Sequence, residues 1–334
     1  MRWWQVMLYP FAILYDLITR FRNHLYNIQY KKSFRFEVPV VSVGNLSVGG
    51  TGKTPMITYL IEYFLNQERS IAILSRGYGR KTKGFRVCTT KDTPGTVGDE
   101  PFTYFEKFGD QVLVAVGEDR AMAIPFILAE QPTTEVILLD DAYQHRSVKP
   151  SFNVLLTTAK RPFWEDYVLP SGLLRESRKG ASRSDAIIVT KSNEQTHYPS
   201  LEKLGKPYFQ TAVSYGVPVF FHGNPTTTGQ VVAVAGLADN RPFFNHVEAH
   251  YQVSLTLSFN DHHHYNEKDI AAILSKMEGC TLLTTHKDAV KLKTFSQLAT
   301  VPCAFIPIKV TFLAEEERFL NMVEESLKDF SINQ

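Results

Sequence analysis

The stretch VPVVSVGNLSVGGTGKT, from Val38 to Thr54, decides the fold of this chain. A short apolar run leads into a glycine-rich turn, and a helical pattern begins at Lys53 and Thr54. This order predicts a strand, a loop that binds phosphate and the N-terminus of a helix. Backbone without side chains can approach a polyphosphate closely, while the N–H groups and the dipole of the helix start attract its negative charge. In such a loop Lys53 would reach the β- and γ-phosphates of a nucleotide and Thr54 would hold Mg²⁺.

The glycine pattern departs from the strict phosphate-loop motif, G-x-x-x-x-G-K-[ST], at one position. Ser47 stands where the motif has its first glycine, and the glycines come later, as GGTGKT. This spacing is typical of a subgroup of phosphate-loop proteins. A glycine-rich turn without a ligand is the alternative, but nothing structural requires a lysine such as Lys53 directly after so many glycines.

Composition and charge place the chain among globular proteins. At 334 residues, with 44% hydrophobic and 21% charged residues, it is long enough for two domains and a sizeable core. A formal net charge of +2 gives no support to a nucleic-acid partner. The cysteines lie far apart without a C-x-x-C pair, which argues against a disulfide framework or a zinc ribbon and predicts reduced thiols in the cytosol. They are Cys88, Cys280 and Cys303.

The most apolar segment is WWQVMLYPFAILYDLITRFRNHLYN, which spans residues 3–27. Pro10 and Asp16 interrupt it and no small-residue cleavage site follows, so it makes a poor signal peptide and a poor transmembrane span. Its apolar residues recur at helical spacing, and basic residues follow. We predict a helix that either lies on an anionic membrane surface or packs on the protein's own core.

Two adjacent carboxylates, Asp140 and Asp141, follow an apolar run in EVILLDDAYQHR. A buried parallel strand would deliver both to its carboxyl end, where open α/β sheets bind ligands. We interpret them as Mg²⁺-binding residues beside the phosphate loop. The alternative is that one aspartate caps the next turn.

Further polar sequences follow other predicted strands. SRGYGR carries Arg76, which either faces an anionic group or is solvated. Asp99 opens a helix in VGDEP, as a cap or as a catalytic carboxylate. LPSGLLRESRKGASRSD sets Glu176 among several cations, as a site for a phosphate-bearing or metal-bound ligand or as a solvated basic loop. VTKSN is superficially similar to the T-K-x-D element by which GTPases read guanine, but Asn193 replaces the carboxylate.

The composition changes from about residue 211, where SYGVPVFFHGNPTTTG is rich in proline, glycine and threonine. We place the domain junction here, between a parallel, doubly wound sheet that carries the phosphate loop and a smaller α/β domain. The smaller domain holds two polar clusters, NDHHHYNE with histidines at 262–264 and TTHKDAVKL with His286. Three consecutive histidines cannot all face one metal on a regular element, so a catalytic or phosphate-facing histidine is preferred over zinc, and a solvated loop remains the alternative.

With these motifs assembled, the chain resembles the tetraacyldisaccharide 4′-kinase family, the lipid A 4′-kinases of Gram-negative bacteria. The resemblance runs over nearly the whole length, with SVGNLSVGGTGKTP, SRGYGR, VGDEP, LDDAYQHR, LPSGLLRE, FNDHHHY and TTHKDAVKL in the family's order. It implies ATP-dependent phosphorylation of the 4′-hydroxyl of a tetraacylated glucosamine disaccharide 1-phosphate, the lipid A precursor. It also implies a peripheral location at the cytoplasmic face of the bacterial inner membrane, with the N-terminal helix on the anionic membrane surface. We expect no nucleic-acid partner and no obligate protein partner.

The resemblance implies a role for each matching residue. Asp99 matches the family's proposed catalytic base and His262 its histidine partner, and because they lie in different halves of the chain, closure of the two domains would complete the site. The Mg²⁺ ion would be surrounded by Thr54, Asp141 and Glu176. The substrate or nucleotide would contact Arg76, Gln144, His145 and Arg175. The ATP phosphates would bind Ser47, Val48, Gly49, Gly50, Thr51, Gly52, Lys53 and Thr54.

Two positions depart from the family's pattern without touching the predicted chemistry. His286 stands where the family usually has glutamate in T-E-K-D, and Ala142 replaces the glycine of D-D-G-F-Q-H.

From the motifs and the change of composition we expect a membrane-interfacial helix over 1–30, a phosphate-loop kinase core over 31–215 and a smaller α/β domain over 216–334. The alternative is a phosphate-loop GTPase switch or a metal-insertion protein, for which GGTGKT, VTKSN and the histidine run argue; such a protein would prefer GTP and bind metal at 262–264.

Overall fold

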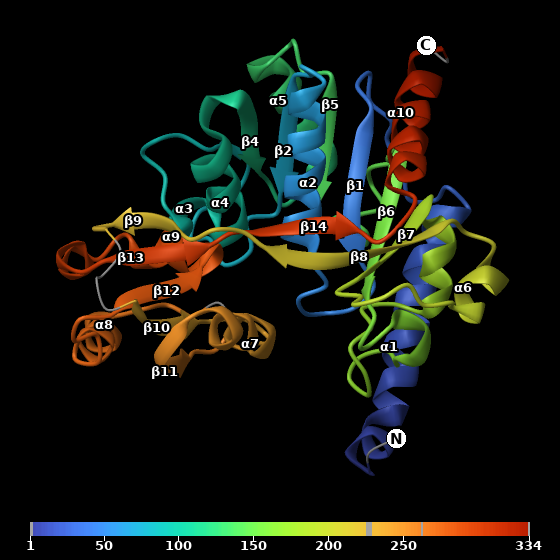
Figure 1. Ribbon diagram of the computed structural model, residues 1–334. Coiled ribbons are helices and arrows are strands. Elements are labelled where there is room, and N and C mark those ends of the chain that lie inside the picture. The colour runs from blue at the N-terminus through green and yellow to red at the C-terminus, as the bar shows by residue number, and fades with distance from the viewer. Residues whose placement is uncertain (1–2, 225–228, 262, 333–334) are drawn as a thin grey trace.

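The structure is a computed structural model that describes residues 3–224, 229–261 and 263–332. In this described part of the chain the strands form two sheets, one of nine strands and one of five. Helices flank the larger sheet on both faces, as Figure 1 shows. The predicted α/β class is therefore confirmed, and so is the presence of a large parallel sheet with a smaller second one.

The larger sheet has the strand order β14-β8-β7-β6-β1-β5-β2-β4-β3. Neighbours from β8 to β4 run parallel, and the edge strands β3 and β14 are antiparallel to their partners. The central strands β1, β2, β5 and β7 are buried along their whole length, which explains their nearly continuous apolar sequences. The strands are β1 Val40–Asn45, β2 Ile71–Ser75, β3 Arg86–Val87, β4 Val112–Val116, β5 Val136–Asp140, β6 Phe152–Thr158, β7 Ala186–Thr190, β8 Tyr208–Tyr215 and β14 Ile308–Phe312.

Two groups of helices build the core of this unit. On one face α2, α4 and α10 bury Leu60, Tyr104 and Phe319 against the strands. On the other face α5 buries Ile124 and Ile127. The helices outside the second sheet are α1 Trp3–Asn27, α2 Lys53–Asn66, α3 Pro94–Val97, α4 Asp99–Phe108, α5 Arg120–Glu130, α6 Pro199–Leu204 and α10 Glu316–Ile332, with short 3-10 helices at Gly109–Gln111, Phe163–Glu165 and Arg178–Arg183.

The smaller sheet has the order β11-β10-β12-β13-β9, with β9 antiparallel to β13 and the other neighbours parallel. One face packs on α7 through Phe243 and Val247, and the other packs on α8 through Ile270 and Ile273. The elements are β9 Val219–His222, β10 Gln230–Ala235, α7 Arg241–His250, β11 Gln252–Ser258, α8 Glu267–Leu274, β12 Thr281–Thr285, α9 His286–Leu292, a 3-10 helix at Ser296–Thr300 and β13 Cys303–Ile306.

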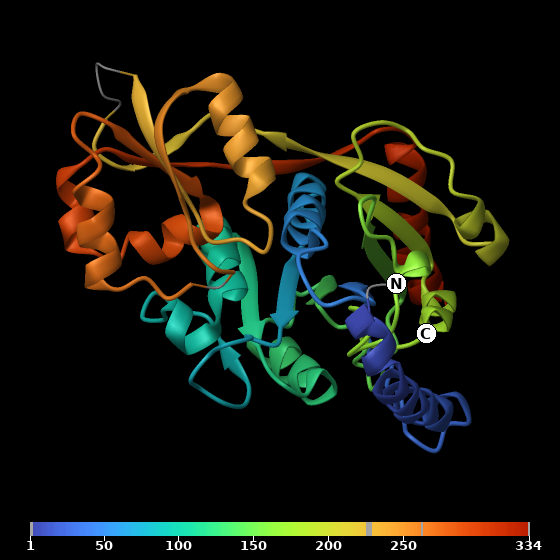
Figure 2. The ribbon, with the colours of Figure 1, turned by 90° about the horizontal axis from the view of Figure 1, so that it is seen from below.

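The chain crosses between the two sheets twice. After β8 it enters the smaller sheet at β9, and after β13 it returns as β14, which pairs with β8 from Ile308 opposite Tyr215 to Phe312 opposite Thr211. Figures 1 and 2 show β8 and β14 as ribbons that join the two sheets. We call residues 3–215 and 308–332 the core lobe and residues 216–307 the second lobe.

This arrangement differs from the expected division, which assigned all of 216–334 to the smaller domain. Strand β14 is hydrogen-bonded into the larger sheet, and α10 packs on it because Phe319 stacks on Phe312 at 5.1 Å between ring centroids and also contacts Phe209 and Phe152. The described residues after 307 therefore lie in the core lobe.

The N-terminal segment forms the predicted helix, α1, and its two sides differ. One side binds the core lobe through polar contacts, in which Gln5 exchanges hydrogen bonds with Ser171 and Tyr15 donates to the Arg175 carbonyl at 3.0 Å. The other side is apolar and exposed, and α1 projects beyond the rest of the core lobe (Figure 1). No helix in the described ranges has both the length and the apolar character needed to cross a bilayer.

Candidate functional site

The glycine-rich loop lies between β1 and α2, at the carboxyl edge of the larger sheet. Gly49 and Gly52 have φ values of 109° and 89°, which side chains rarely adopt, so the loop needs glycine at both places. Inside the loop Asn45 donates to the Thr51 hydroxyl at 2.7 Å. The predicted phosphate-binding residues 47–54 thus form a continuous segment, a loop that leads into the first residues of α2.

The end of β7 holds this loop by its backbone. Thr190 donates its hydroxyl to the Thr51 carbonyl at 2.8 Å, and Lys191 donates its ammonium to the Gly50 carbonyl at 2.9 Å. The VTKSN sequence therefore contacts the loop itself. This contact does not favour the GTPase alternative, which assigned Lys191 and its neighbours to a nucleotide base.

Asp140 and Asp141 stand at the end of β5, beside the loop, and their surroundings differ. Asp140 is fully buried; Tyr104 donates to its Oδ2 at 3.4 Å, and its Oδ1 has no partner among the described residues. Burial, followed by the charges of Glu100 and Asp141, raises the pKa of Asp140 to about 8. Asp141 adopts a φ of 49° although it is not glycine, a strained conformation of the kind that clusters at functional sites.

Asp141 connects two cations at this edge. Arg175 donates Nη1 to both of its carboxylate oxygens at 3.1 Å, and the Lys53 ammonium lies 3.7 Å away. Gln144 joins the same network, because it accepts from Arg175 at 3.4 Å and donates to the Asn45 carbonyl at 2.9 Å. The structure thus brings together Lys53, Asp141, Gln144 and Arg175, four residues assigned to the site from the sequence.

The oxygen atoms at this edge fit a hard divalent cation. The unpartnered Oδ1 of Asp140, the Asp141 carboxylate and the hydroxyl of Thr54, which contacts Tyr104, are the donors that Mg²⁺ prefers. Glu176, the third residue expected at the metal, is 3% exposed and accepts hydrogen bonds from Asn23, Gln144 and Arg183 at 2.7, 3.1 and 2.7 Å. No three His, Cys, Asp or Glu side chains in the described part of the chain gather as a metal site.

A buried arginine that the sequence reasoning did not single out lies close to this cluster. Arg120 is 2% exposed, and its guanidinium donates to the carbonyls of Gly117 and Glu118 at 3.1 Å each. Burial lowers its pKa to about 10, and the charge of Asp140 opposes this shift. A signal was available, because Arg120 begins α5 only four residues after the end of β4, whose carboxyl end lies at the same edge of the sheet as the phosphate loop.

His145 and Arg76, both predicted to contact the substrate or nucleotide, differ in their surroundings. His145 accepts at Nε2 from the backbone N–H of Arg120 at 3.1 Å, so the neutral ring carries its proton on Nδ1. Burial, followed by the charge of Arg120, lowers the pKa of His145 to about 4, and the ring is therefore neutral at pH 7. Arg76 is exposed at the end of β2.

Asp99 is the first residue of α4 and lies where the two lobes meet. Its carboxylate forms an ion pair of 2.7 Å with Lys291 of α9, in the second lobe. Its predicted partner, His262, lies outside the described residues. Lys291 was not selected from the sequence, because no local pattern shows which side chain of the second lobe reaches a residue nearly two hundred positions earlier.

Two other histidines of the polar clusters, His263 and His286, have partners of their own. His263 pairs with Asp269 at 2.9 Å, and His286 stacks on Phe305 with ring centroids 4.4 Å apart. Burial, followed by the charges of Lys293 and Lys107, lowers the pKa of His286 to about 4. These contacts do not favour a zinc site or the metal-insertion alternative.

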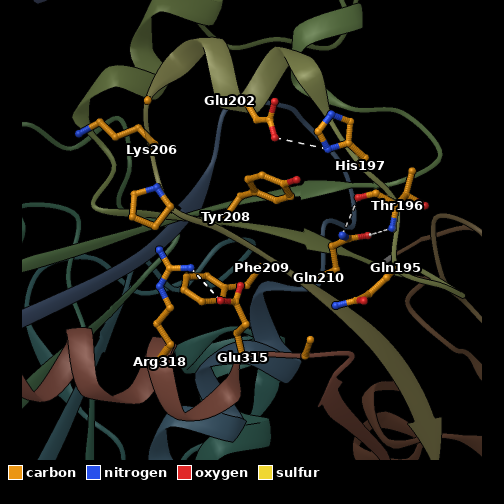
Figure 3. Close-up of a pocket in the computed structure, with 13 residues that line it drawn as sticks. Gln195, Thr196, His197, Glu202, Lys206, Tyr208, Phe209, Gln210, Glu315 and Arg318 are labelled. Carbon is orange, nitrogen blue, oxygen red and sulfur yellow. Dashed lines mark hydrogen bonds and ion pairs between the residues drawn. The ribbon is translucent and has the colours of Figure 1, made fainter.

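A separate recess of about 710 Å³ lies between β8, α6 and α10. As Figure 3 shows, two pairs form among its lining side chains, His197 with Glu202 at 3.4 Å and Arg318 with Glu315 at 2.8 Å. Its lining includes none of the phosphate-loop residues. We therefore place the candidate site at the carboxyl edge of the larger sheet and not in this recess.

Relatives of known name match the chain over almost its whole length. A family model described as tetraacyldisaccharide-1-P 4′-kinase matches residues 4–328. The tetraacyldisaccharide 4′-kinase of Flavobacterium johnsoniae is 40% identical and covers 96% of this chain and 98% of its own length. That of Cytophaga hutchinsonii is 34% identical, with 97% and 96% covered.

A solved structure agrees with these relatives. The crystal structure of LpxK from Aquifex aeolicus in complex with ATP is 33% identical to this chain, with a TM-score of 0.80, and the match covers 97% of this chain and 99% of that one. The likeness thus includes both lobes and the strand–loop–helix unit of the phosphate loop. By sequence and by fold, the chain belongs to the tetraacyldisaccharide-1-P 4′-kinase family.

Proposed function

We propose that this protein transfers the γ-phosphoryl group of ATP to the 4′-hydroxyl of tetraacyldisaccharide 1-phosphate, the lipid A precursor. The observation that carries the proposal is the cluster of Lys53, Asp141 and Arg175 beside a phosphate loop, with the start of α4 at the same edge. Tyr104 of α4 reaches Asp140 there, and the charge of Glu100 acts on that same carboxyl group. These contacts of α4 support our assignment of Asp99 and the loop to one site.

Phosphoryl transfer requires positioning and charge neutralisation more than covalent catalysis. Backbone N–H groups of the loop and Lys53 bind the β- and γ-phosphates, and Arg175 and Arg120 add positive charge beside them. Asp99 accepts the proton of the 4′-hydroxyl. The hydroxyl oxygen at the same time attacks the γ-phosphorus, and the bond from phosphorus to the ADP oxygen breaks. Mg²⁺, for which Thr54, Asp140 and Asp141 provide suitable oxygens, supplies further neutralisation of the phosphate charge when bound.

The exposed face of α1 supports a peripheral position on a membrane. Met7, Phe11, Leu14, Ile18 and Phe21 follow one another three or four residues apart, so they share one side of the helix, and each is more than half exposed. Exposed basic residues follow at Lys31, Lys32 and Arg35. An apolar helix side with a basic flank suits the surface of an anionic leaflet, and we place the protein at the cytoplasmic face of the inner membrane, where a tetraacylated disaccharide would enter the site.

The test is transfer of labelled phosphate from ATP to tetraacyldisaccharide 1-phosphate in mixed micelles, with GTP as a competing donor. We expect product from ATP with the wild type and loss of product in Lys53→Ala and Asp99→Ala, while GTP competes poorly. Lys160→Ala, an exposed lysine that pairs with Asp239, serves as the control and retains transfer. Faster hydrolysis of GTP than of ATP, with no lipid product, would contradict the proposal.

A further inference from the structure

We propose that Lys291 is a positioning residue for phosphoryl transfer, which the second lobe contributes to hold the Asp99 carboxylate where it accepts the hydroxyl proton. The proposal rests on the function proposed above, because it assumes that Asp99 is the base. The second lobe would thus influence the chemical step, because its Lys291 holds the base of the core lobe.

Lys291 is nearly buried, and its ammonium group has two polar contacts. The lysine is only 8% exposed, and burying an ammonium group is costly unless it is paired. Its Nζ lies 2.7 Å from Asp99 Oδ2 and donates to the His263 carbonyl at 3.1 Å. One ammonium thus connects the start of α4 in the core lobe to the DHHHY segment of the second lobe.

The backbone at Asp99 is already fixed, so the direction of its side chain is what a partner can control. Gly98 has a φ of 98°, and a Cβ there would lie 3.0 Å from the Cα of Gly77, which means that the VGDEP and SRGYGR turns are in close contact. Thr103 donates to the Asp99 carbonyl at 2.8 Å within α4. The Lys291 ammonium, 2.7 Å from Oδ2, restricts the rotation of the Asp99 carboxylate about its side-chain bonds.

A second ion pair at the same contact between the lobes provides a matched control. Helices α4 and α9 are in contact, and Lys293, the residue that follows α9, pairs with Glu106 of α4 at 3.0 Å. This pair is more exposed, with 31% and 24% of the two side chains accessible, against 8% and 12% for Lys291 and Asp99. Lys293→Met therefore removes an interlobe ion pair without touching the carboxylate at the site.

Lys291 takes no part in the proton transfer itself. As the hydroxyl oxygen bonds to the γ-phosphorus, its proton goes to the Asp99 carboxylate, and the electron pair of the breaking bond leaves with ADP. Removing Lys291 therefore leaves every reacting group in place and takes away the contact that holds the Asp99 carboxylate toward the hydroxyl proton. The expected effect is a loss of kcat with little change in the KM for ATP or lipid, because the phosphate loop is untouched.

The experiment compares the steady-state kinetics of Lys291→Met, Lys291→Gln, Lys291→Arg and Lys293→Met with the wild type, and equilibrium binding of ATP checks that each variant folds. We expect kcat to fall about 10- to 100-fold in the two neutral variants, with both KM values within about threefold. Lys291→Arg restores part of the rate because it keeps the charge, and Lys293→Met stays within about twofold of the wild type.

A double variant identifies the residue through which Lys291 acts. If the lysine works by positioning Asp99, adding Lys291→Met to Asp99→Ala causes no further loss of kcat, whereas independent roles would multiply the two losses. Equal losses in Lys291→Met and Lys293→Met would assign the effect to lobe docking and overturn the proposal. Loss of ATP binding in both neutral variants would also overturn it, because Lys291 would then be needed for folding.

The same set of variants separates this proposal from the function on which it rests. If Asp99→Ala keeps transfer, the role of Asp99 as base is wrong. If Asp99→Ala loses transfer while Lys291→Met and Lys291→Gln keep the wild-type kcat, the kinase assignment stands and only the positioning role fails.

Discussion

Lys191 donates its ammonium to the carbonyl oxygen of Gly50 at 2.9 Å, so the strand that ends at Thr190 holds the phosphate loop by its backbone. Thr190 adds a second hydrogen bond, to the Thr51 carbonyl at 2.8 Å, and is itself 4% exposed. A glycine-rich loop has little conformational preference of its own. The end of β7 therefore supplies part of the order that the loop needs to bind phosphate.

Thr190→Val should weaken ATP binding more than it weakens the fold. Valine has the same shape but no hydroxyl, so the carbonyls of Thr51 and Thr157 lose the one buried O–H donor that they share, at a cost of about 1 kcal/mol or about fivefold in the KM for ATP. Thr158→Val, in the neighbouring strand, is the control, because its hydroxyl bonds are exposed. Steady-state kinetics with varied ATP measure the effect, and equal KM values in the two variants would contradict the role of Thr190.

Asp140 should make the metal-free protein less stable as the pH rises. An unfolded aspartate ionises near pH 4, whereas burial holds the pKa of Asp140 at about 8 in the folded chain. Between these values the folded chain binds a proton that the unfolded chain has released, so stability falls as the pH rises toward 8. Asp140→Asn cannot ionise, and we expect it to raise the melting temperature relative to the wild type at pH 8 more than at pH 5.

Thermal unfolding in the presence of a chelator measures this difference. Asp110→Asn changes an exposed aspartate outside the site and is the control. It should shift the melting temperature by the same amount at pH 5 and at pH 8. A difference between Asp140→Asn and the wild type that is the same at pH 5 and pH 8 would show that the carboxyl group of Asp140 ionises in the folded chain as it does in water.

The sequence predicted the parts of the site that follow from local patterns. The phosphate loop and the Asp140–Asp141 pair each lie at the carboxyl end of a buried parallel strand, and such strands are recognisable as short apolar runs that end in polar residues. The confirmed family resemblance came from the same motifs. What could not be predicted depends on the path of the chain through space. Lys291 reaches Asp99 across the lobes, and α10 packs on the larger sheet only because β14 returns to pair with β8.

Glu176 illustrates a different limit. Its motif marks it as part of the site, and the structure surrounds it with the donors Asn23, Gln144 and Arg183. Two of these donors come from α1 and from the segment after β5, which sequence spacing cannot place beside residue 176. The motif therefore predicted the importance of the position but gave no information about its partners, and the metal role of Glu176 stays a prediction.

His286 should affect acid stability and not catalysis. Burial holds its pKa at about 4, below the value of about 6.5 in an unfolded chain, so the unfolded chain takes up a proton that the folded chain refuses. Stability is then fully present above pH 6.5 and is lost as the pH falls toward 4. As the pH falls from 7.5 to 5, the free energy of unfolding of His286→Gln, measured in urea, should rise by about 1–2 kcal/mol relative to that of the wild type.

The same variant should keep kcat within about twofold, since glutamine removes the titrating ring but leaves the reacting groups untouched. His250→Gln, on the exposed end of α7, is the matched control for the unfolding measurement. A tenfold loss of kcat in His286→Gln would place this ring in the chemistry and contradict a purely structural role.

The apolar side of α1 should carry the attachment to membranes. Phe11 and Ile18 are 62% and 60% exposed, and transferring two such side chains from water into the interfacial region of a bilayer contributes a few kcal/mol. We therefore expect Phe11→Glu with Ile18→Glu to weaken sedimentation with anionic vesicles about 10- to 100-fold, while ATP binding stays at its wild-type value.

A carboxylate placed on an exposed apolar side chain elsewhere separates this effect from the added charge alone. Met122 on α5 is 65% exposed, and Met122→Glu with a second exposed change, Phe126→Glu, adds the same charge far along the chain from α1. If the α5 pair reduces vesicle binding as much as the α1 pair, repulsion from the anionic surface explains both results. If only the α1 pair does, the apolar side of α1 is the membrane-binding surface, and transfer to substrate presented in vesicles should fall with it while transfer in mixed micelles is retained.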